Sequence, residues 1–579
     1  MREGELYDRD LPRCAANHVP LSPVTFLDRS AAVWPERTAL VYGRRRTSWR
    51  ALRHRCRALA SALRGRGIGR GGTVAALAAN TPELFELHFA VPLSGGVLAA
   101  LNTRLDAATI AWMLEHCEAQ ILFVDREFAA IAADAVARLG RGIAVIDIDD
   151  PACLHRRAAI GECDYEALVA EGDASEALPP LEDEWDAIAL NYTSGTTGEP
   201  KGVVYHHRGA YLNAVSNALD WQLTRDCVYL WTLPMFHCNG WCFAWTIAAV
   251  GGMAVCLRQV RTHAIVEAIA REGVTHLCGA PTVLTMIDAA GPEVLASLKT
   301  GVSVMVAAAP PPPSVIEAIE RHGWTVTHVY GLTESYGPVM INEWQAEWNG
   351  RDAEARTALK ARQGVRGHML EDVMVADPRT LQPMPADSSS VGELFLRGNN
   401  VMKGYLRQAE ATEAAFRGGW LHTGDLAVRH PDGYVEIRDR AKDIIISGGE
   451  NIATIEIENA LHRHPSVQGA AVVARPDPLW GETPCAFVEL RPGESADANA
   501  LIAYCRTVLA RFKVPRHVIF GPLPRSSTGK VLKYVLRETA REDAEGRSGL
   551  GPADSDGETA FDDKHDLAEI RHPPIARQF

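Results

Sequence analysis

Short apolar runs alternate with amphipathic stretches along the first half of the chain. Residues 49–63 place apolar side chains at helical spacing, whereas 73–79 and 120–124 are continuous apolar runs with the length of buried strands. The same alternation returns between residues 188 and 329, where 302–306 is a further strand pattern. Strands that alternate with helices favour a parallel sheet covered on both faces. We therefore predict an α/β fold whose large N-terminal domain contains doubly wound sheets.

The pattern changes near residue 391. Residues 391–396 and 433–437 alternate apolar and polar positions beside glycine-containing turns, which predicts a small β subdomain. Helical spacing at 455–464 then precedes two strand patterns and another helix, which indicates a small, mobile α+β domain. The end of the chain is polar and poor in large apolar groups, so a loosely ordered tail is expected. The predicted division is an N-terminal domain at 1–438, a hinge at 439–442, a C-terminal domain at 443–540 and a tail at 541–579.

Composition narrows the class of protein. The 579 residues are 47% hydrophobic and carry a net charge of −13, which argues against general nucleic-acid binding. The N-terminal sequence lacks the apolar core of a secretory signal, and the longest apolar stretch is shorter than the ~18–20 residues of a membrane span. The 12 cysteines include no pair at CxxC spacing, and free thiols fit a reducing compartment. We therefore expect a cytoplasmic protein with no integral membrane segment and no nucleic-acid partner.

A segment rich in glycine and hydroxyl groups follows a strand pattern at residues 187–191. It runs from Tyr192 to Gly202 with the sequence YTSGTTGEPKG and contains Lys201. Glycines let backbone N–H groups point at an anion, hydroxyl groups add donors, and the ammonium supplies charge. Its spacing is not that of a Walker A loop. The segment predicts a phosphate-binding loop, with an ordinary surface turn as the alternative.

The residues alone also predict a hairpin that brings Asp425 opposite Arg440. The sequence HPDG at 430–433 is a strong turn signal between two alternating strands. If the chain folds back about Asp432 and Gly433, positions equidistant from this turn face each other, and Asp425 and Arg440 are such a pair. We expect their charged groups to meet at the open end of the hairpin, either within a site or as a surface ion pair.

The phosphate-loop sequence resembles the signature loop of the adenylate-forming superfamily, which includes acyl-CoA synthetases, luciferases and peptide-synthetase adenylation domains. Four further motifs follow in that family's order: YGLTE at 330–334, WLHTGD at 420–425, DRAKDIIISGGE at 439–450 and PRSSTGK at 524–530. The resemblance covers about residues 20–540. It implies an acyl-CoA synthetase that uses ATP and Mg²⁺ to convert a carboxylic acid to an acyl-adenylate, and then transfers the acyl group to coenzyme A.

The resemblance also assigns roles to residues around the nucleotide. Thr193 and Glu334 would be ligands of Mg²⁺, a hard cation that prefers oxygen donors, and Thr333 would bind phosphate oxygens. Tyr330 would pack on the adenine, and Gly331 would leave room for the acyl carboxylate. Two loops are expected to surround the nucleotide with Ser194, Gly195, Thr196, Thr197, Gly198, Ala309 and Pro310.

Two lysines complete the implied catalytic set of Thr193, Lys201, Glu334 and Lys530. Lys201 would neutralise the triphosphate, and Lys530 would bridge the carboxylate and the α-phosphate during adenylation. Lys442 falls at the hinge about which the small domain would rotate between the two half-reactions. In addition, Asp425 would hold the ribose hydroxyls with help from Arg440. The pantetheine arm of coenzyme A would pass a loop made of Ser447, Gly448 and Gly449.

The acid pocket is expected at residues 234–241, with the sequence PMFHCNGW. If Asn239 begins a helix, His237 and Trp241 lie on the same side of its first turn. The indole would then shorten the pocket and favour small or medium acids, although Trp241 as an ordinary core residue is the alternative. The sequence of this segment is similar to those of short- and medium-chain acyl-CoA ligases, including methylmercaptopropionate–CoA ligases.

Three other functions stay open at this point. The acceptor of the acyl group could be a carrier protein or oxygen instead of coenzyme A. A nucleotide-binding protein could have kept the fold without the chemistry. A kinase or simple NTPase would release ADP and phosphate instead of AMP and pyrophosphate. The sequence also leaves open the natural acid and the choice between a monomer and a homodimer.

Overall fold

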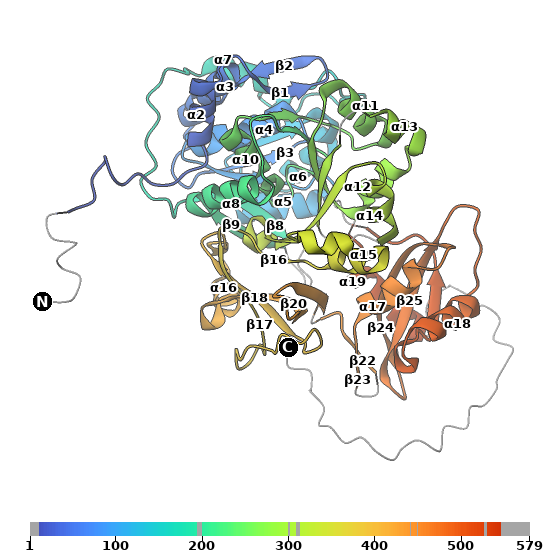
Figure 1. The fold of residues 1–579 in the computed structure, drawn as a ribbon. Helices are drawn as coiled ribbons and strands as arrows, with labels where there is room; N and C mark the ends of the chain where they lie inside the picture. The colour runs from blue at the N-terminus through green and yellow to red at the C-terminus, as the bar shows by residue number, and fades with distance from the viewer. Residues whose placement is uncertain are drawn as a thin grey trace, which may run out of the picture. The chain divides into compact units, whose positions relative to one another are not determined.

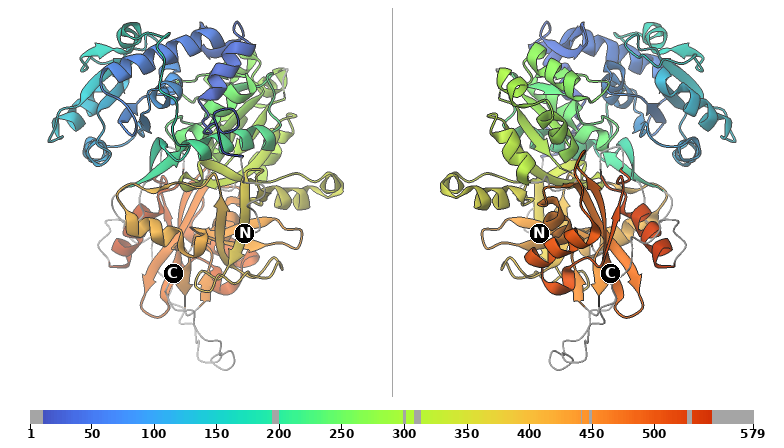
Figure 2. Two further views of the ribbon diagram at one scale, coloured as in Figure 1. Left: turned by 90° about the vertical axis from the view of Figure 1, so that its left-hand side faces the viewer. Right: turned by 90° about the vertical axis from the view of Figure 1, so that its right-hand side faces the viewer.

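The computed structural model describes residues 11–193, 200–298, 301–307, 313–440, 442–447, 450–525 and 530–545. The chain forms two compact units: a first unit of Met1–Val373 with Leu396–Leu421, and a second unit of Met374–Phe395 with His422–Phe579. Helices and strands alternate through the first unit, and helices cover the strands of its sheets (Figures 1 and 2). The α/β prediction is confirmed. The two units divide at residues 373, 395 and 421, before the expected hinge at 439–442. The predicted domain boundaries stay a prediction.

The phosphate-loop segment belongs to an eight-stranded sheet of the first unit. This sheet has the order β19-β9-β8-β4-β3-β5-β6-β7 and is parallel except at β9 and β19. Strands β3 and β5 are almost wholly buried, which explains why they appear in the sequence as continuous apolar runs. The strands are β3 (Thr73–Leu77), β4 (Val97–Ala100), β5 (Ile121–Asp125), β6 (Ala144–Ile148), β7 (Cys163–Asp164), β8 (Ala187–Thr193), β9 (Lys201–His206) and β19 (Gly404–Tyr405).

A nine-stranded sheet carries the YGLTE motif. Its order is β16-β15-β14-β13-β12-β10-β11-β1-β2, and its middle strands are parallel. Helix α4 is buried along almost its whole length because it contacts β4 of one sheet and β1 of the other. The strands are β1 (Thr38–Tyr42), β2 (Arg45–Ser48), β10 (Val228–Leu230), β11 (Met253–Val255), β12 (His276–Gly279), β13 (Ser303–Val306), β14 (Thr325–Leu332), β15 (Gly337–Ile341) and β16 (Val365–Arg366).

Several helices of the first unit begin where the sequence supplies a side-chain cap or a proline. Helix α3, for example, starts after Ser48, whose hydroxyl accepts a hydrogen bond from the Ala51 N–H at 3.2 Å. The α-helices are α2 (Thr25–Val33), α3 (Trp49–Gly65), α4 (Pro82–Leu93), α5 (Ala107–His116), α6 (Ala129–Ala137), α7 (Tyr165–Glu171), α8 (His207–Asp220), α9 (Cys238–Trp241), α10 (Phe243–Val250), α11 (Thr262–Glu272), α12 (Pro281–Asp288), α13 (Pro292–Ser297), α14 (Pro313–Glu320), α15 (Ala353–Ala361) and α16 (Ala409–Ala415). Short 3₁₀ turns are η1 (Arg126–Phe128), η2 (Thr333–Ser335), η3 (Ala346–Gly350) and η4 (Arg417–Gly419).

A four-stranded sheet and an α+β layer contain the remaining strands. The sheet has the order β17-β18-β20-β21, with β17 (Leu370–Ala376), β18 (Gly392–Gly398), β20 (Leu421–Arg429) and β21 (Val435–Arg440). The layer contains β22 (Ile445–Ser447), β23 (Glu450–Ile452), β24 (Val467–Asp477), β25 (Gly481–Leu490), β26 (His517–Phe520), helices α17 (Thr454–His462), α18 (Ala498–Val508) and α19 (Lys533–Ala544), and the turn η5 (Arg511–Lys513).

Successive side chains of β24 enter different cores, as strand geometry requires. Ala470 and Val472 pack with α17 and α18, whereas Ala471 and Val473 pack with α19. Because α19 continues to Ala544, the expectation of a tail starting at 541 is corrected for residues 541–544. Residues 546–579 lie outside the described residues. None of the described helices combines the length and apolar character needed to cross a bilayer.

Candidate functional site

The YGLTE motif forms the end of β14 and the turn η2. Tyr330 is half-buried and faces Met340 of β15, and Glu334 is half-buried in the turn. A Cβ atom at Gly331 would lie 1.7 Å from the Gly337 carbonyl oxygen. Close packing of β14 against β15 is therefore sufficient to require glycine at 331, whether or not an acyl group also needs the space.

Three neighbours contact Thr333 and Glu334 of η2. The Tyr405 hydroxyl donates a hydrogen bond to Glu334 Oε1 at 2.8 Å, and the Tyr205 hydroxyl donates one to the Thr333 carbonyl at 2.7 Å. Cys238 Sγ lies 3.4 Å from Thr333 Oγ1. Sequence reasoning missed Tyr405, Tyr205 and Cys238. Each reaches η2 from a distant segment, and nothing in the local pattern of apolar and polar positions predicts such a contact.

The phosphate-loop segment begins and ends on paired strands. Thr193 at the end of β8 faces Lys201 at the start of β9 in the antiparallel ladder, and both are half-buried. Lys201 Nζ lies 4.8 Å from the centroid of the Tyr405 ring, so one tyrosine contacts both Lys201 and Glu334. The expected loop residues Ser194, Gly195, Thr196, Thr197, Gly198, Ala309 and Pro310 lie outside the described residues.

The chemistry of Glu334 fits a divalent cation. Its carboxylate accepts a hydrogen bond from a neutral hydroxyl, and within the described residues no lysine or arginine forms an ion pair with it. In the described part of the chain the carboxylate therefore keeps its negative charge without a direct ion pair, and a hard oxygen ligand of this kind suits Mg²⁺. Thr193 adds a hydroxyl oxygen at the end of β8.

In the second unit the predicted pair of Asp425 and Arg440 is confirmed. The two residues face each other in the β20–β21 ladder, and Arg440 Nε lies 3.3 Å from Asp425 Oδ1. The assumed two-residue turn is wrong, because the His430 N–H bonds to the Tyr434 carbonyl at 2.8 Å and encloses a three-residue loop. A register shift between Leu426 and Ala427 then compensates for this offset.

Lys530 belongs to the same group of charges. It is half-buried, and the pKa of its ammonium is lowered to about 7, first by burial and then by the positive charge of Arg440, whereas Asp425 acts in the opposite direction. Lys442 is exposed and contributes another repulsive charge to Lys530. Ser447 ends β22 and is half-buried, while Gly448 and Gly449 lie outside the described residues.

The segment expected to line the acid pocket does not begin an ordinary helix at Asn239. All five residues from Cys238 to Cys242 have positive φ angles, between 42° and 64°, so the chain makes a left-handed turn. His237 precedes this turn and is half-buried, and Trp241 is buried with its backbone next to Gly337. The assumed helix start at Asn239 is therefore wrong, and the roles of His237 and Trp241 at the acid stay a prediction.

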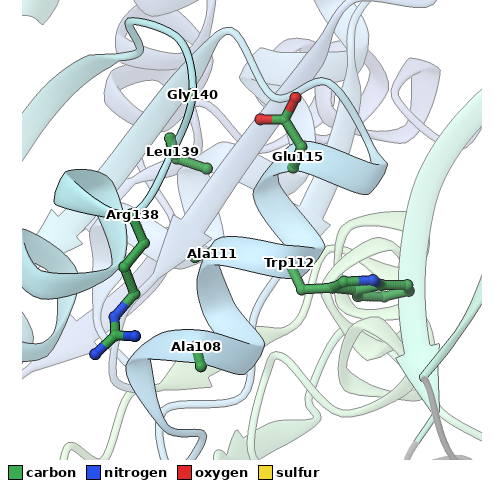
Figure 3. A pocket seen from close by; sticks show the side chains of 7 residues that line it. All are labelled: Ala108, Ala111, Trp112, Glu115, Arg138, Leu139 and Gly140. Atoms are coloured by element: carbon green, nitrogen blue, oxygen red, sulfur yellow. The ribbon is translucent and has the colours of Figure 1, made fainter.

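A shallow pocket on the first unit lies apart from these residues. It has a volume of about 340 Å³ and is lined by Ala108, Ala111, Trp112, Glu115, Arg138, Leu139 and Gly140 (Figure 3). None of the predicted site residues lines it. Its connection to the phosphate-loop segment is indirect: the Trp112 ring stacks on His116, whose Nδ1 lies 2.8 Å from the Tyr192 hydroxyl.

The fold and the residues gathered in each unit define an adenylate-forming enzyme. A family model described as AMP-binding enzyme matches residues 27–406, and one described as AMP-binding enzyme C-terminal domain matches residues 456–530. The chain belongs to the AMP-binding enzyme family.

Near full-length relatives activate acids with coenzyme A according to their names. The chain is 48% identical to the acetate–CoA ligase CCL3 of Humulus lupulus, over 92% of this chain and 97% of that protein. It is 47% identical to the peroxisomal acetate/butyrate–CoA ligase AAE7 of Arabidopsis thaliana, over the same shares of both chains.

Solved structures of acid–CoA ligases share the fold. ATP-bound MatB from Rhodopseudomonas palustris matches with a TM-score of 0.78 and 28% identity, over 90% of this chain and 99% of that one. The O-succinylbenzoate coenzyme A synthetase MenE from Bacillus subtilis, in complex with ATP and a magnesium ion, matches with a TM-score of 0.74 and 27% identity. That match covers 89% of this chain and 98% of MenE.

The names of several relatives contradict the predicted cytoplasmic location. AAE7, the trans-cinnamate:CoA ligase of Petunia hybrida and the benzoate–CoA ligase of Arabidopsis thaliana are all named as peroxisomal. The prediction is therefore wrong. A missing apolar signal argues only against secretion, and a targeting address that a receptor reads leaves no mark on composition or cysteine usage.

Proposed function

We propose that this protein is an acyl-CoA synthetase for short carboxylic acids. It couples the acid to the α-phosphate of ATP with release of pyrophosphate, and then transfers the acyl group to the thiol of coenzyme A with release of AMP. The observation that carries this proposal is the near full-length likeness to ligases named for acetate and for acetate or butyrate.

The first half-reaction needs groups that offset negative charge. A carboxylate oxygen attacks the α-phosphorus, the bond to the bridging oxygen breaks, and pyrophosphate leaves with that electron pair. Lys201 and the phosphate loop would bind the triphosphate, and Glu334 with Thr193 would hold Mg²⁺. The metal, when bound, offsets phosphate charge. Lys530 would contact the carboxylate and the α-phosphate as charge shifts between them.

The second half-reaction breaks the acyl–phosphate bond. The sulfur of coenzyme A attacks the acyl carbonyl, and AMP leaves as the thioester forms. Asp425 is buried and paired with Arg440, so its carboxylate is held in one orientation that could accept hydrogen bonds from ribose hydroxyls. We assign the hinge to Lys442 and the pantetheine path to the loop at 447–449, both of which follow from the family resemblance.

Trp241 is the residue we assign to the limit on acid length. Its carbonyl accepts a hydrogen bond from Asn217 Nδ2 at 2.8 Å, and its backbone approaches Gly337, three residues after Glu334. These contacts with Asn217 and Gly337 would hold Trp241, and with it the bulky indole, near the YGLTE motif. A fixed aromatic wall excludes longer acids by steric overlap, while short acids still fit.

The test is a product analysis over a graded set of acids. Purified enzyme is incubated with ATP, Mg²⁺, coenzyme A and acetate, propionate, butyrate, hexanoate, octanoate or benzoate, and all products are quantified. We expect AMP, pyrophosphate and acyl-CoA in equal amounts, with the largest kcat/KM among acids of two to four carbons. Pyrophosphate without thioester would indicate another acceptor, and ADP with phosphate would indicate a kinase or NTPase.

A further inference from the structure

Tyr405 contacts both charged side chains that the proposed function places at the phosphates. Its hydroxyl donates to Glu334 Oε1 at 2.8 Å, and its ring centroid lies 4.8 Å from Lys201 Nζ. The three residues come from three separate segments, β19, η2 and the start of β9. Tyr405 is therefore the shared neighbour of a carboxylate and an ammonium that come from distant parts of the sequence.

The backbone around Tyr405 is fixed on both sides. Strand β19 pairs with β9, with Tyr405 opposite Val203, and the Tyr405 N–H donates to Thr412 Oγ1 at 2.9 Å. Three residues before Tyr405, the Met402 N–H donates to the Glu334 carbonyl at 2.7 Å. These bonds connect the same short segment to β9 and to η2, so the position of the ring does not depend on a bound nucleotide.

We propose that Tyr405 is a positioning residue for the metal–nucleotide site. Its hydroxyl holds one oxygen of Glu334, fixes the plane of the carboxylate and leaves the second oxygen for Mg²⁺, while its ring face holds the Lys201 ammonium. A neutral hydroxyl suits this role because it orients the carboxylate without cancelling its charge, as an arginine would. Attraction between a cation and an aromatic face keeps Lys201 near Glu334 without a direct ion pair. This inference rests on the proposed role of Glu334.

The experiment measures binding and not turnover. ATP is titrated calorimetrically into the full-length enzyme without acid, once with Mg²⁺ and once with EDTA, and the ratio of the two affinities gives the metal-dependent gain. We expect Tyr405→Phe to reduce this gain about tenfold, because the variant loses a hydrogen bond to a charged group, and to leave affinity in EDTA unchanged. Tyr405→Leu should also weaken binding in EDTA a few-fold, since Lys201 loses its aromatic neighbour.

A double-mutant cycle separates positioning from general damage. Glu334→Ala should lose the metal-dependent gain, and adding Tyr405→Phe to it should change nothing further. If Glu334→Ala keeps the gain, the proposed role of Glu334 fails. If Glu334→Ala loses the gain but Tyr405→Phe keeps it, the role of Tyr405 is overturned. An equal loss from Tyr405→Phe with and without Glu334 would overturn it as well.

The chain offers a matched control for the lost hydroxyl. Tyr165 donates to Glu86 Oε2 at 2.8 Å, the same kind of bond at the same length, between buried residues of the first unit outside the proposed site. Tyr165→Phe should lower the unfolding temperature at least as much as Tyr405→Phe while keeping the full metal-dependent gain. A loss of gain in Tyr165→Phe would mean that the assay reports stability, and the proposal would fall.

Discussion

A cluster of carboxylates and the single carboxylate of Glu334, both in the first unit, differ in their partners. Asp125, Glu127 and Cys153 lie close enough together to ligate a metal ion. Arg258 occupies that place instead, with Nη1 2.8 Å from Asp125 Oδ2 and Nη2 2.5 Å from Glu127 Oε2. Glu334 forms no such ion pair among the described residues. It accepts a hydrogen bond from the neutral hydroxyl of Tyr405. The charge of the partner, and not the number of acidic side chains, distinguishes the two.

The arginine cluster also joins the two large sheets. Asp125 ends β5 of the eight-stranded sheet, and Tyr42 ends β1 of the nine-stranded sheet. Tyr42 donates to Asp150 at 2.5 Å, and Asp150 is 2.7 Å from Arg258. Buried carboxylates that an arginine holds serve structure, whereas a carboxylate held only by a neutral hydroxyl is available to a ligand.

Removing the Glu334 carboxylate should give the largest effect on activity. Glu334→Ala is expected to lower acid-dependent pyrophosphate release by about 10²–10³-fold, because the phosphate charge loses its metal. Initial rates at saturating ATP and Mg²⁺ measure the loss. Glu127→Gln removes a charge from the arginine cluster and should keep the rate. The comparison fails if both variants lose activity alike, or if Glu334→Ala retains it.

Removing the central cation should affect stability instead. Arg258→Met leaves Asp125 and Asp150 buried without their partner, which costs about 3–5 kcal/mol. The midpoint of the first urea-induced transition should fall, while the rate per folded molecule stays constant. Arg53→Met is the control, since Arg53 and Asp28 form an exposed pair that contributes only about 0–1 kcal/mol. Equal shifts for both variants would contradict a structural role for Arg258.

The contrast also explains how far the sequence could be interpreted. Strands such as β3 and β5 were predictable because burial on both faces leaves an uninterrupted apolar run. The pairing of Asp425 with Arg440 was predicted correctly although the assumed turn was wrong, because a longer loop and a register shift cancel. Family motifs identified Glu334, but its contact with Tyr405 depends on β19, a two-residue strand that is too short to leave a periodic pattern.

The turn at 238–242 was beyond sequence reasoning for a different reason. A left-handed conformation costs roughly 1–2 kcal/mol for each non-glycine residue, so local preference predicts a right-handed turn. Tertiary contacts help to offset that cost: the Asn239 N–H donates to Asn191 Oδ1 at 2.9 Å, and Asn217 binds the Trp241 carbonyl. Strain held by surrounding structure in this way is often found at functional sites.

Two buried tryptophans extend the comparison to apolar residues. Trp241→Gly should raise kcat/KM for hexanoate relative to butyrate by about tenfold, because a cavity opens beside the acid. Glycine suits the backbone there, since φ at 241 is +53°. Trp245, whose indole N–H donates to the His88 carbonyl at 3.0 Å, is the control. Trp245→Leu should lower stability and leave the ranking of acids by kcat/KM unchanged. An unchanged ranking in Trp241→Gly would show that Trp241 is an ordinary core residue.

Arg440 offers the finest comparison, because it neighbours a carboxylate, as Arg258 does, but also a lysine. Burial and, after it, the positive charge of Arg440 lower the pKa of Lys530 to about 7. If adenylation requires the Lys530 ammonium, kcat/KM for pyrophosphate release should fall as pH rises through about 7 in the free enzyme.

Replacing the Arg440 guanidinium should shift the alkaline limb of the pH profile to higher pH. Arg440→Gln removes a repulsive charge, so the pKa of Lys530 rises and the fall in kcat/KM should occur up to about one pH unit higher. The midpoint between pH 5.5 and 9 is measured separately from the maximal rate, since the same variant also weakens the support of Asp425. Lys530→Ala should have a much lower rate and no alkaline limb of this kind. A midpoint that stays in place or moves downward in Arg440→Gln would show that another group titrates. The charge partners of Asp425 would then resemble the structural cluster at Arg258 more than an active site.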